Sequence, residues 1–299
     1  MGDFEPSVRF QSPPFWGIWG AEADQNGAMP SAHVSVTMTC VYTVAYRGLR
    51  AGKSNLESEI SRVNASSYLR GAIVQPDLKT APKRIEVLAE RREPQPDNCQ
   101  LIKLSTNQGE IQGRYYQAEH AKLGAIWVGG ISGGWDSPAN GLYPQLCQKL
   151  RESQVSSLRV RYRYSTILKE ALLDTLTGIA FLAQEEVSAI ALIGHSFGGA
   201  VVIQAAMLSP LVQTVITLAS QSHGADLAAY LAPQCSLLLL HGTDDQILSP
   251  NCSRYIYAIA QEPKRLILYP GARHSLDEVS DQVSQAICDW TIEQLTPKR

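Results

Sequence analysis

The chain has 299 residues, a formal net charge of −2 and a pI of about 6.3. This balance gives no sign of a nucleic-acid-binding surface, and no run of about eighteen apolar residues predicts a membrane span. The six cysteines form no C-x-x-C pair, and no His/Cys cluster has metal-ligand spacing. We therefore expect free thiols in a reducing compartment, no metal site, no nucleic-acid partner and no membrane-spanning segment.

Residues 1–95 show scattered Gly and Ser, a Pro-Pro pair and little hydrophobic periodicity. They predict an N-terminal extension that is disordered or loosely structured, joined to the rest by the charged, Pro-containing stretch 91–98. The start, Met-Gly-Asp-Phe-Glu-Pro, fits neither a signal peptide nor a myristoylation signal, and the early acidic residues argue against a transit peptide. A cytoplasmic location is the expectation.

Residues 96–299 predict a single domain in which strands alternate with helices. Its first element is a hairpin, because 100–103 and 111–117 alternate apolar and polar residues around Asn107-Gln108-Gly109. Strand-like runs follow at 124–129, 157–163, 187–194, 214–220, 235–241 and 264–270, and helix-like segments at 143–153, 168–185, 199–208, 251–261 and 276–294. This order predicts an α/β fold with a mostly parallel central sheet and helices on both faces.

The most informative stretch is Gly194-His195-Ser196-Phe197-Gly198-Gly199, which follows a buried strand and opens a helix-like run. The pattern G-x-S-x-G needs glycines beside the serine because the strand-to-helix turn is sharp. Such a turn pushes the serine hydroxyl out of the sheet beside the helix N-terminus, where free N–H groups can stabilise negative charge. Ser196 is the predicted nucleophile; the alternative is a turn without chemistry.

A nucleophilic serine needs a base, and the base needs an acid to orient it. Asp244 and Asp245 follow the apolar run 236–240, and His274 follows the strand-like run 265–269. Carboxyl ends of parallel strands meet at one edge of the sheet, so these groups should lie beside Ser196. The order Ser, Asp, His is also the chain order found in α/β-hydrolases.

The chain therefore resembles the α/β-hydrolase superfamily, through G-H-S-F-G-G at 194–199, H-G-T-D-D-Q-I-L at 241–248 and G-A-R-H at 271–274. The resemblance covers about residues 100–296 and is nearest to small serine hydrolases without a cap, of the dienelactone-hydrolase-like and simple esterase kind. In the family pattern the acid lies four residues after the histidine that closes the strand, which favours Asp245 and leaves Asp244 as the second choice. Asp226, after the preceding strand, is a further but more distant candidate.

The resemblance also implies an oxyanion hole made by the N–H groups of Phe197 and Ile131. Ile131 lies in Gly129-Gly130-Ile131-Ser132-Gly133-Gly134, which follows a strand but does not fit a nucleotide-binding loop. The expected substrate pocket is lined by the following residues: Gly130, Ser132, Trp135, His195 and His223. For Trp135 the alternative is packing of the loop.

Among the other histidines, His195 sits beside the serine on a turn and should point away from it. His241 closes a strand and is expected to bond the local backbone. His223, in Q-S-H-G, is the rival to His274 as the base.

The predicted function is hydrolysis of a carboxylic ester, thioester or lactone through an acyl-enzyme on Ser196, Asp245 and His274, with no metal or organic cofactor. Only about fifteen residues separate the strand-like run ending near Ser220 from that starting at Ser236, which leaves no room for a large cap. The expected partner is a small-molecule acyl substrate. An acyltransferase on the same fold, or a non-catalytic binding protein, is the alternative; the oligomeric state is not predicted.

Overall fold

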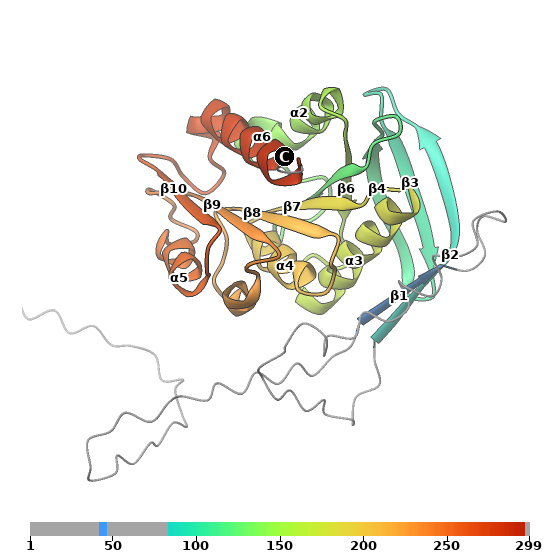
Figure 1. Cartoon of the computed structure of the whole chain (residues 1–299), viewed down its shortest axis with the longest axis horizontal. Helices are drawn as coiled ribbons and strands as arrows, with labels where there is room; N and C mark the ends of the chain where they lie inside the picture. Colours follow the sequence, from blue (N-terminus) through green and yellow to red (C-terminus); the bar gives the residue numbers. More distant parts are fainter. Residues whose placement is uncertain (1–41, 47–82, 297–299) are drawn as a thin grey trace, which may run out of the picture. The chain divides into compact units, whose positions relative to one another are not determined.

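The computed structural model describes residues 42–46 and 83–296, and their strands form one ten-stranded sheet (Figure 1). The strand order across the sheet is β1-β2-β3-β4-β6-β5-β7-β8-β9-β10. The strands are β1 Tyr42–Tyr46, β2 Lys83–Pro94, β3 Gln100–Thr106, β4 Gly109–Tyr116, β5 Leu123–Val128, β6 Val155–Arg161, β7 Ala189–His195, β8 Val212–Leu218, β9 Ser236–Gly242 and β10 Lys264–Tyr269. The α-helices are α2 Pro138–Glu152, α3 Leu168–Gln184, α4 Phe197–Ala206, α5 Asn251–Ile259 and α6 Ser280–Leu295, and the 3₁₀ segments are η2 Asp226–Tyr230 and η3 Asp277–Val279.

The six strands from β6 to β10 in this order are parallel to one another. β9 is buried at every residue, and β7 is buried at all but its first. Strands covered on both faces carry continuous apolar runs rather than alternating ones, which is why the sequence marked them clearly. All the strand-like and helix-like segments predicted between residues 124 and 294 correspond to observed elements.

Helices cover both faces of this sheet. α2 and α6 pack on one face, and α3, α4 and α5 pack on the other (Figure 1). Each face therefore has its own apolar cluster, with the sheet between them. The predicted architecture, a mostly parallel sheet between two helical layers, is confirmed.

The strands β2, β3 and β4 form the antiparallel part of the sheet. β3 and β4 pair across the turn at Asn107 and Gln108, as the hairpin prediction states. Burial alternates along β3, with Ile102 and Leu104 facing the core. A period of two is what a strand covered on one face requires.

The predicted boundary at residue 96 is wrong. β2 lies within the predicted extension, yet its residues from Val87 to Pro94 pair with β3, and β1 pairs with the first part of β2. Ile85 and Val87 are fully buried in the core of the domain. The stretch 91–98, predicted as a linker, is the end of β2 and the turn into β3. The rest of the predicted extension, 1–41 and 47–82, lies outside the described residues.

A chain truncated to begin at Cys99 should be markedly less stable than the full chain. It lacks Ile85 and Val87, whose burial stabilises the fold by roughly 3–6 kcal/mol. It also lacks Arg92, whose Nη2 lies 2.8 Å from Glu185 Oε1 at the end of α3. Total stabilities are about 5–15 kcal/mol, so the truncated chain should aggregate or unfold at much lower urea concentration.

The matched control is a second truncated chain, which begins at Thr37 and keeps both β1 and β2. It should retain the urea midpoint of the full chain. Equal midpoints for the two truncated chains would contradict the assignment of β2 to the folded domain.

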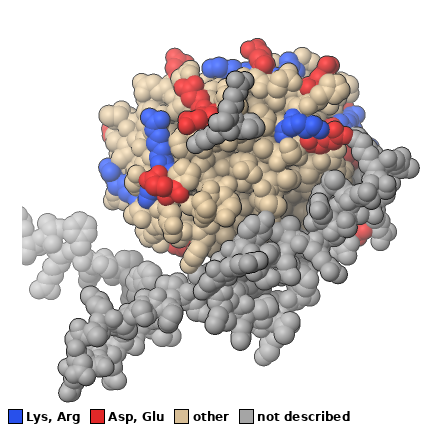
Figure 2. All heavy atoms as spheres, in the orientation of Figure 1, with Lys and Arg blue, Asp and Glu red and all other residues tan. Residues whose placement is uncertain are grey.

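The connection between β8 and β9 holds only η2 among its regular elements. The described residues thus contain no separate cap over this edge of the sheet. None of the described helices combines the length and the apolar character that a membrane crossing requires. On the face drawn in Figure 2, the described acidic and basic side chains are interspersed.

Candidate active site

Ser196 lies between the last residue of β7 and the first residue of α4, where the chain reverses sharply. Its φ is +56° and ψ is −116°, a conformation that non-glycine residues rarely adopt. A side chain at Gly194 would collide with the backbone of Gly198, so the close packing of strand and helix depends on that glycine. The serine side chain is thereby presented at the carboxyl edge of the sheet.

The Asp245 side chain is fully buried. Its Oδ1 accepts hydrogen bonds from the N–H groups of Ile247 at 2.8 Å and Leu248 at 2.9 Å. Its Oδ2 lies 2.7 Å from Nδ1 of His274 and 3.1 Å from Nε2 of His241. The turn after β9 thus holds the carboxylate in one orientation.

His274 links this carboxylate to the serine. Its Nε2 lies 3.0 Å from Oγ of Ser196, and its Nδ1 donates to Asp245 at 2.7 Å. The ring comes from the loop after β10, and 17% of its side chain is exposed. The structure therefore brings together the three residues that the sequence nominated, in one hydrogen-bonded series.

Electrostatics favour a charged Asp245. Burial alone would raise the pKa of Asp245, but the hydrogen bonds from His274, Leu248 and Ile247 outweigh burial and hold that pKa below its ordinary value. The carboxylate is consequently ionised at neutral pH. An ionised carboxylate keeps a proton on Nδ1 of His274 and leaves Nε2 free to accept the hydroxyl proton of Ser196.

The loop after β5 passes directly over the serine. A side-chain carbon at Gly130 would lie 3.3 Å from Cβ and 3.7 Å from Oγ of Ser196, which shows how closely this backbone approaches. Phe197 opens α4, so its N–H is among those that a helix leaves without an internal partner. The N–H groups of Phe197 and Ile131 remain the predicted oxyanion hole.

The predicted pocket residues are spread over different parts of the site. Ser132 is exposed on the loop after β5, and His223 is exposed on the loop after β8. Trp135 instead packs on the sheet: its ring lies 4.7 Å from the guanidinium carbon of Arg114 and 5.8 Å from that of Arg159, and its carbonyl accepts from Arg159. These arginines lie in β4 and β6, which β5 separates from β7 and Ser196 in the sheet order. Trp135 therefore anchors the loop after β5 to the sheet, which is the alternative interpretation given for it.

The alternative acids, Asp244 and Asp226, and the alternative base, His223, lie outside the hydrogen-bonded series of Ser196, His274 and Asp245. Asp244 is exposed and accepts a hydrogen bond from the Thr243 hydroxyl. Asp226 accepts from the hydroxyl of Tyr255 in α5. The ring that bonds Ser196 is that of His274, whereas His223 contributes its carbonyl to a bond with Gln221.

His195 is only 6% exposed and is not an open pocket wall. Its Nε2 donates to the carbonyl of His274 at 3.1 Å, and the two rings lie 4.9 Å apart. Burial lowers the pKa of His195 to about 4, so the ring is uncharged at neutral pH. His195 therefore steadies the backbone of the His274 loop, and its Nδ1 lies near Gly130, within the site.

Sequence reasoning missed two residues at this site, His241 and Ser253. His241 bonds the local backbone at the Leu248 carbonyl, as expected, but it also contacts the Asp245 carboxylate and the Ser253 hydroxyl. The spacing of four residues between His241 and Asp245 was the available signal. Ser253 has no such signal, because only the packing of α5 against β9 brings it near.

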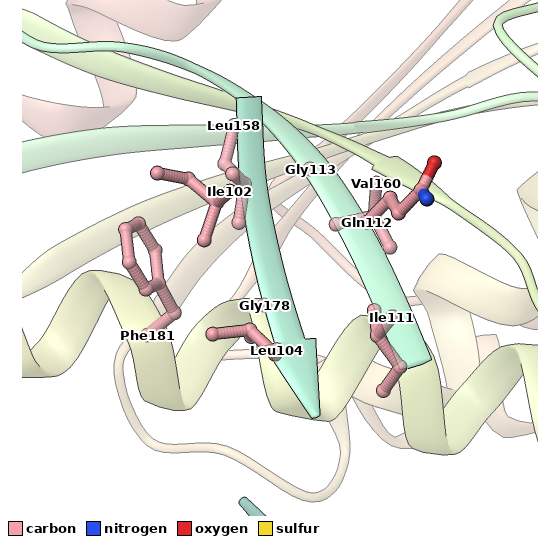
Figure 3. A pocket seen from close by; sticks show the side chains of 9 residues that line it. All are labelled: Ile102, Leu104, Ile111, Gln112, Gly113, Leu158, Val160, Gly178 and Phe181. Atoms are coloured by element: carbon pink, nitrogen blue, oxygen red, sulfur yellow. The ribbon is translucent and has the colours of Figure 1, made fainter. Parts of the chain in front are cut away.

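A small cavity lies elsewhere, between α3 and the strands β3, β4 and β6 (Figure 3). Figure 3 shows the side chains of Ile102, Leu158 and Phe181 gathered around it. Its volume is about 10 Å³ and its lining is mostly apolar, so it is a packing defect too small for an acyl group.

A model of the dienelactone hydrolase family matches residues 145–290. The match is somewhat shorter than half of the chain, and it contains Ser196, Asp245 and His274. The uncharacterized protein YfhR of Escherichia coli (strain K12) is 29% identical over 136 residues, which is 36% of this chain and 47% of that protein. The chain thus spans about half the length of the curated relative it matches.

Many solved structures have the same fold as this chain. Est1E from Butyrivibrio proteoclasticus aligns with a TM-score of 0.56 and 17% identity, covering 65% of this chain and 98% of that one. A dienelactone hydrolase from Anabaena variabilis aligns with a TM-score of 0.56 and 17% identity, covering 69% and 99%. At this identity the likeness establishes the fold.

Proposed function

We propose that this chain, which resembles the dienelactone hydrolase family over residues 145–290 and has an α/β-hydrolase fold, is a serine hydrolase of carboxylic esters, thioesters or lactones. The observation that carries the proposal is the hydrogen-bonded series from Ser196 through His274 to Asp245. A serine, an imidazole and a carboxylate in this order are the parts that acyl transfer through a covalent intermediate requires.

The reaction has two halves. Ser196 Oγ attacks the acyl carbonyl carbon while its proton passes to Nε2 of His274, and the N–H groups of Phe197 and Ile131 hold the oxyanion. The bond to the leaving group then breaks as His274 returns that proton to the leaving oxygen or sulfur. In the second half, water gives a proton to His274, attacks the acyl-enzyme and releases the acid, restoring the Ser196 hydroxyl.

The rim of the site is open and partly apolar, which supports the proposal that the substrate is compact. The loops after β5 and β9 lie on either side of β7 in the sheet order, and each carries an exposed isoleucine: Ile131 is 58% exposed and Ile247 is 72% exposed. Without a cap among the described residues, these side chains can cover only part of a bound acyl or alcohol group. Binding should therefore favour small apolar groups and gain little from long chains.

We expect p-nitrophenyl esters to be hydrolysed with a kcat/KM that levels off or falls beyond short acyl chains. Each methylene beyond the rim stays partly in water and contributes less than the ~0.8 kcal/mol of full burial. The measurement is kcat/KM for esters of rising chain length, below and above the critical micelle concentration, with matched thioesters. No increase in rate is expected when micelles form.

Ile247→Ser should weaken the dependence on chain length, whereas Ile292→Ser, at an exposed position of α6, is the matched control and should leave it unchanged. A steady rise in kcat/KM to long-chain esters, or a jump in rate at the micelle concentration, would refute the open-site proposal. Transfer of the acyl group to an added alcohol in preference to water would identify an acyltransferase instead.

A cytoplasmic location is also part of the proposal. The described cysteines are free thiols, and all but Cys252 are buried. Burial raises the pKa of Cys235 to about 12, so this thiol stays protonated and unreactive at neutral pH. Such thiols are compatible with a reducing compartment.

A further inference from the structure

His241 occupies a fully buried position at the end of β9, where both ring nitrogens have partners. Its Nε2 lies 3.1 Å from Asp245 Oδ2 and 3.0 Å from the carbonyl oxygen of Leu248. Its Nδ1 lies 2.7 Å from Oγ of Ser253 in α5. A carboxylate and a carbonyl can only accept, so Nε2 carries the proton, and Nδ1 accepts from the Ser253 hydroxyl.

Nδ1 accepts from the Ser253 hydroxyl only while the ring is neutral. Burial lowers the pKa of His241, and its partially compensating bonds to Leu248 and Asp245 do not restore the ordinary value. A neutral ring with a fixed tautomer directs one N–H group at the carboxylate and adds no charge to the site.

Oδ2 of Asp245 is the shared atom. It accepts from His241 and from His274, while Oδ1 is held by the N–H groups of Ile247 and Leu248. The amides hold one oxygen, and His241 determines where the other oxygen points. The same N–H group also withdraws negative charge from Oδ2, so Oδ2 attracts a protonated His274 less strongly than an unshared oxygen would.

We propose that His241, locked by Ser253, is a positioning residue that aims and moderates the Asp245 carboxylate for catalysis by Ser196 and His274. The proposal rests on the serine-hydrolase function proposed above. It extends the hydrogen-bonded series to five side chains from five segments: Ser253, His241, Asp245, His274 and Ser196.

The titratable groups around this series are few in the described part of the chain. Asp245 and His274 face His241 from the loops after β9 and β10, and α5 presents the uncharged Ser253. His195 lies against His274 from the end of β7, and the charge of Asp136 acts on His195. A pH response that changes with His241 must therefore pass through Asp245 and His274.

Three variants separate positioning from mere support of the fold. His241→Phe removes the donor to Oδ2, His241→Gln supplies an amide donor in its place, and Ser253→Ala removes only the lock on the tautomer. Ser249→Ala, at an exposed serine of the loop between β9 and α5, is the matched control. The substrate is p-nitrophenyl acetate, and the readouts are kcat, KM and the pH profile of kcat/KM.

We expect His241→Phe to lower kcat by about 10- to 100-fold, the size of one hydrogen bond to a charged group, with little change in KM. The acidic limb of its kcat/KM profile should move to higher pH, because an unshared Oδ2 holds a proton on His274 more strongly. Ser253→Ala should show the same shift with a smaller loss, and His241→Gln should restore the wild-type limb. Ser249→Ala should match the wild type.

An unchanged acidic limb in both His241→Phe and Ser253→Ala, with normal thermal unfolding, would overturn the proposal. So would an equal loss of kcat in His241→Gln and His241→Phe without any shift of the limb. If His241→Phe does not fold, Ser253→Ala decides the matter.

A second readout does not depend on turnover. Proton NMR detects the hydrogen between His274 Nδ1 and Asp245 as a downfield resonance. We expect this resonance to move in Ser253→Ala and to keep its position in Ser249→Ala. A loss of the proposed hydrolase function would appear as equal ester turnover in the wild type and in Ser196→Ala; the NMR comparison would still decide the role of His241.

Discussion

Replacing Ser196 with alanine will lower kcat/KM for ester hydrolysis by about 10³-fold or more. In the proposed mechanism the Ser196 hydroxyl oxygen forms the acyl-enzyme, and this oxygen lies 3.0 Å from His274 Nε2. Without it, only the oxyanion hole and substrate binding remain to assist water. Steady-state kinetics with p-nitrophenyl acetate measure the loss, and circular dichroism checks the fold.

The control for this variant is Ser222→Ala, at a half-buried serine of the loop after β8. It should stay within a few-fold of the wild type because Ser222 is not among the described residues that hydrogen-bond His274. Activity of Ser196→Ala close to that of the wild type would remove the basis for the whole mechanism.

Asp245→Asn will lower kcat by about 10⁴-fold, while Asp244→Asn will stay within a few-fold of the wild type. The asparagine oxygen can still accept from the amides of Ile247 and Leu248, but its NH₂ group then faces the N–H groups of His241 and His274. Two donors cannot bond each other, so His274 must turn or change its tautomer, and Nε2 loses its ability to accept the serine proton.

The two aspartates form a matched pair, because the substitutions are identical and the positions adjacent. Asp244 is exposed, and its carboxylate accepts a hydrogen bond from the neighbouring Thr243 hydroxyl. Rates for both variants at neutral pH, where wild-type Asp245 is ionised, make the comparison direct. A larger loss in Asp244→Asn than in Asp245→Asn would refute the choice of acid.

The parallel half of the sheet could be predicted because its strands are buried on both faces. Runs such as Ser236–Leu240 stand out as apolar, and the glycines around Ser196 mark the turn that joins β7 to α4. The carboxyl edges of these strands then place Asp245 and His274 near Ser196 by topology alone.

β2 could not be recognised in the same way. It is covered on one face only, its sequence is rich in Arg and Glu, and the pairing register shifts between Val87 and Ala89, which disturbs the alternation. The contact between Arg92 and Glu185 joins segments far apart in the sequence. Nothing local in residues 83–94 reveals it.

The finer parts of the site also depend on packing. The spacing from His241 to Asp245 is visible in the sequence, but the hydroxyl of Ser253 reaches His241 only because α5 packs on β9. Trp135 follows a glycine-rich loop, which suggested a pocket wall. Its actual neighbours, Arg114 and Arg159, come from β4 and β6 and are paired across those strands.

The site of covalent attachment shows most directly whether Ser196 is the nucleophile. The full chain is treated with a fluorophosphonate, digested and sequenced by tandem mass spectrometry. We predict one adduct, on Ser196, that is absent from Ser196→Ala and forms in step with the loss of esterase activity. Loss of activity with the adduct on another residue, or full labelling of Ser196→Ala, would contradict it.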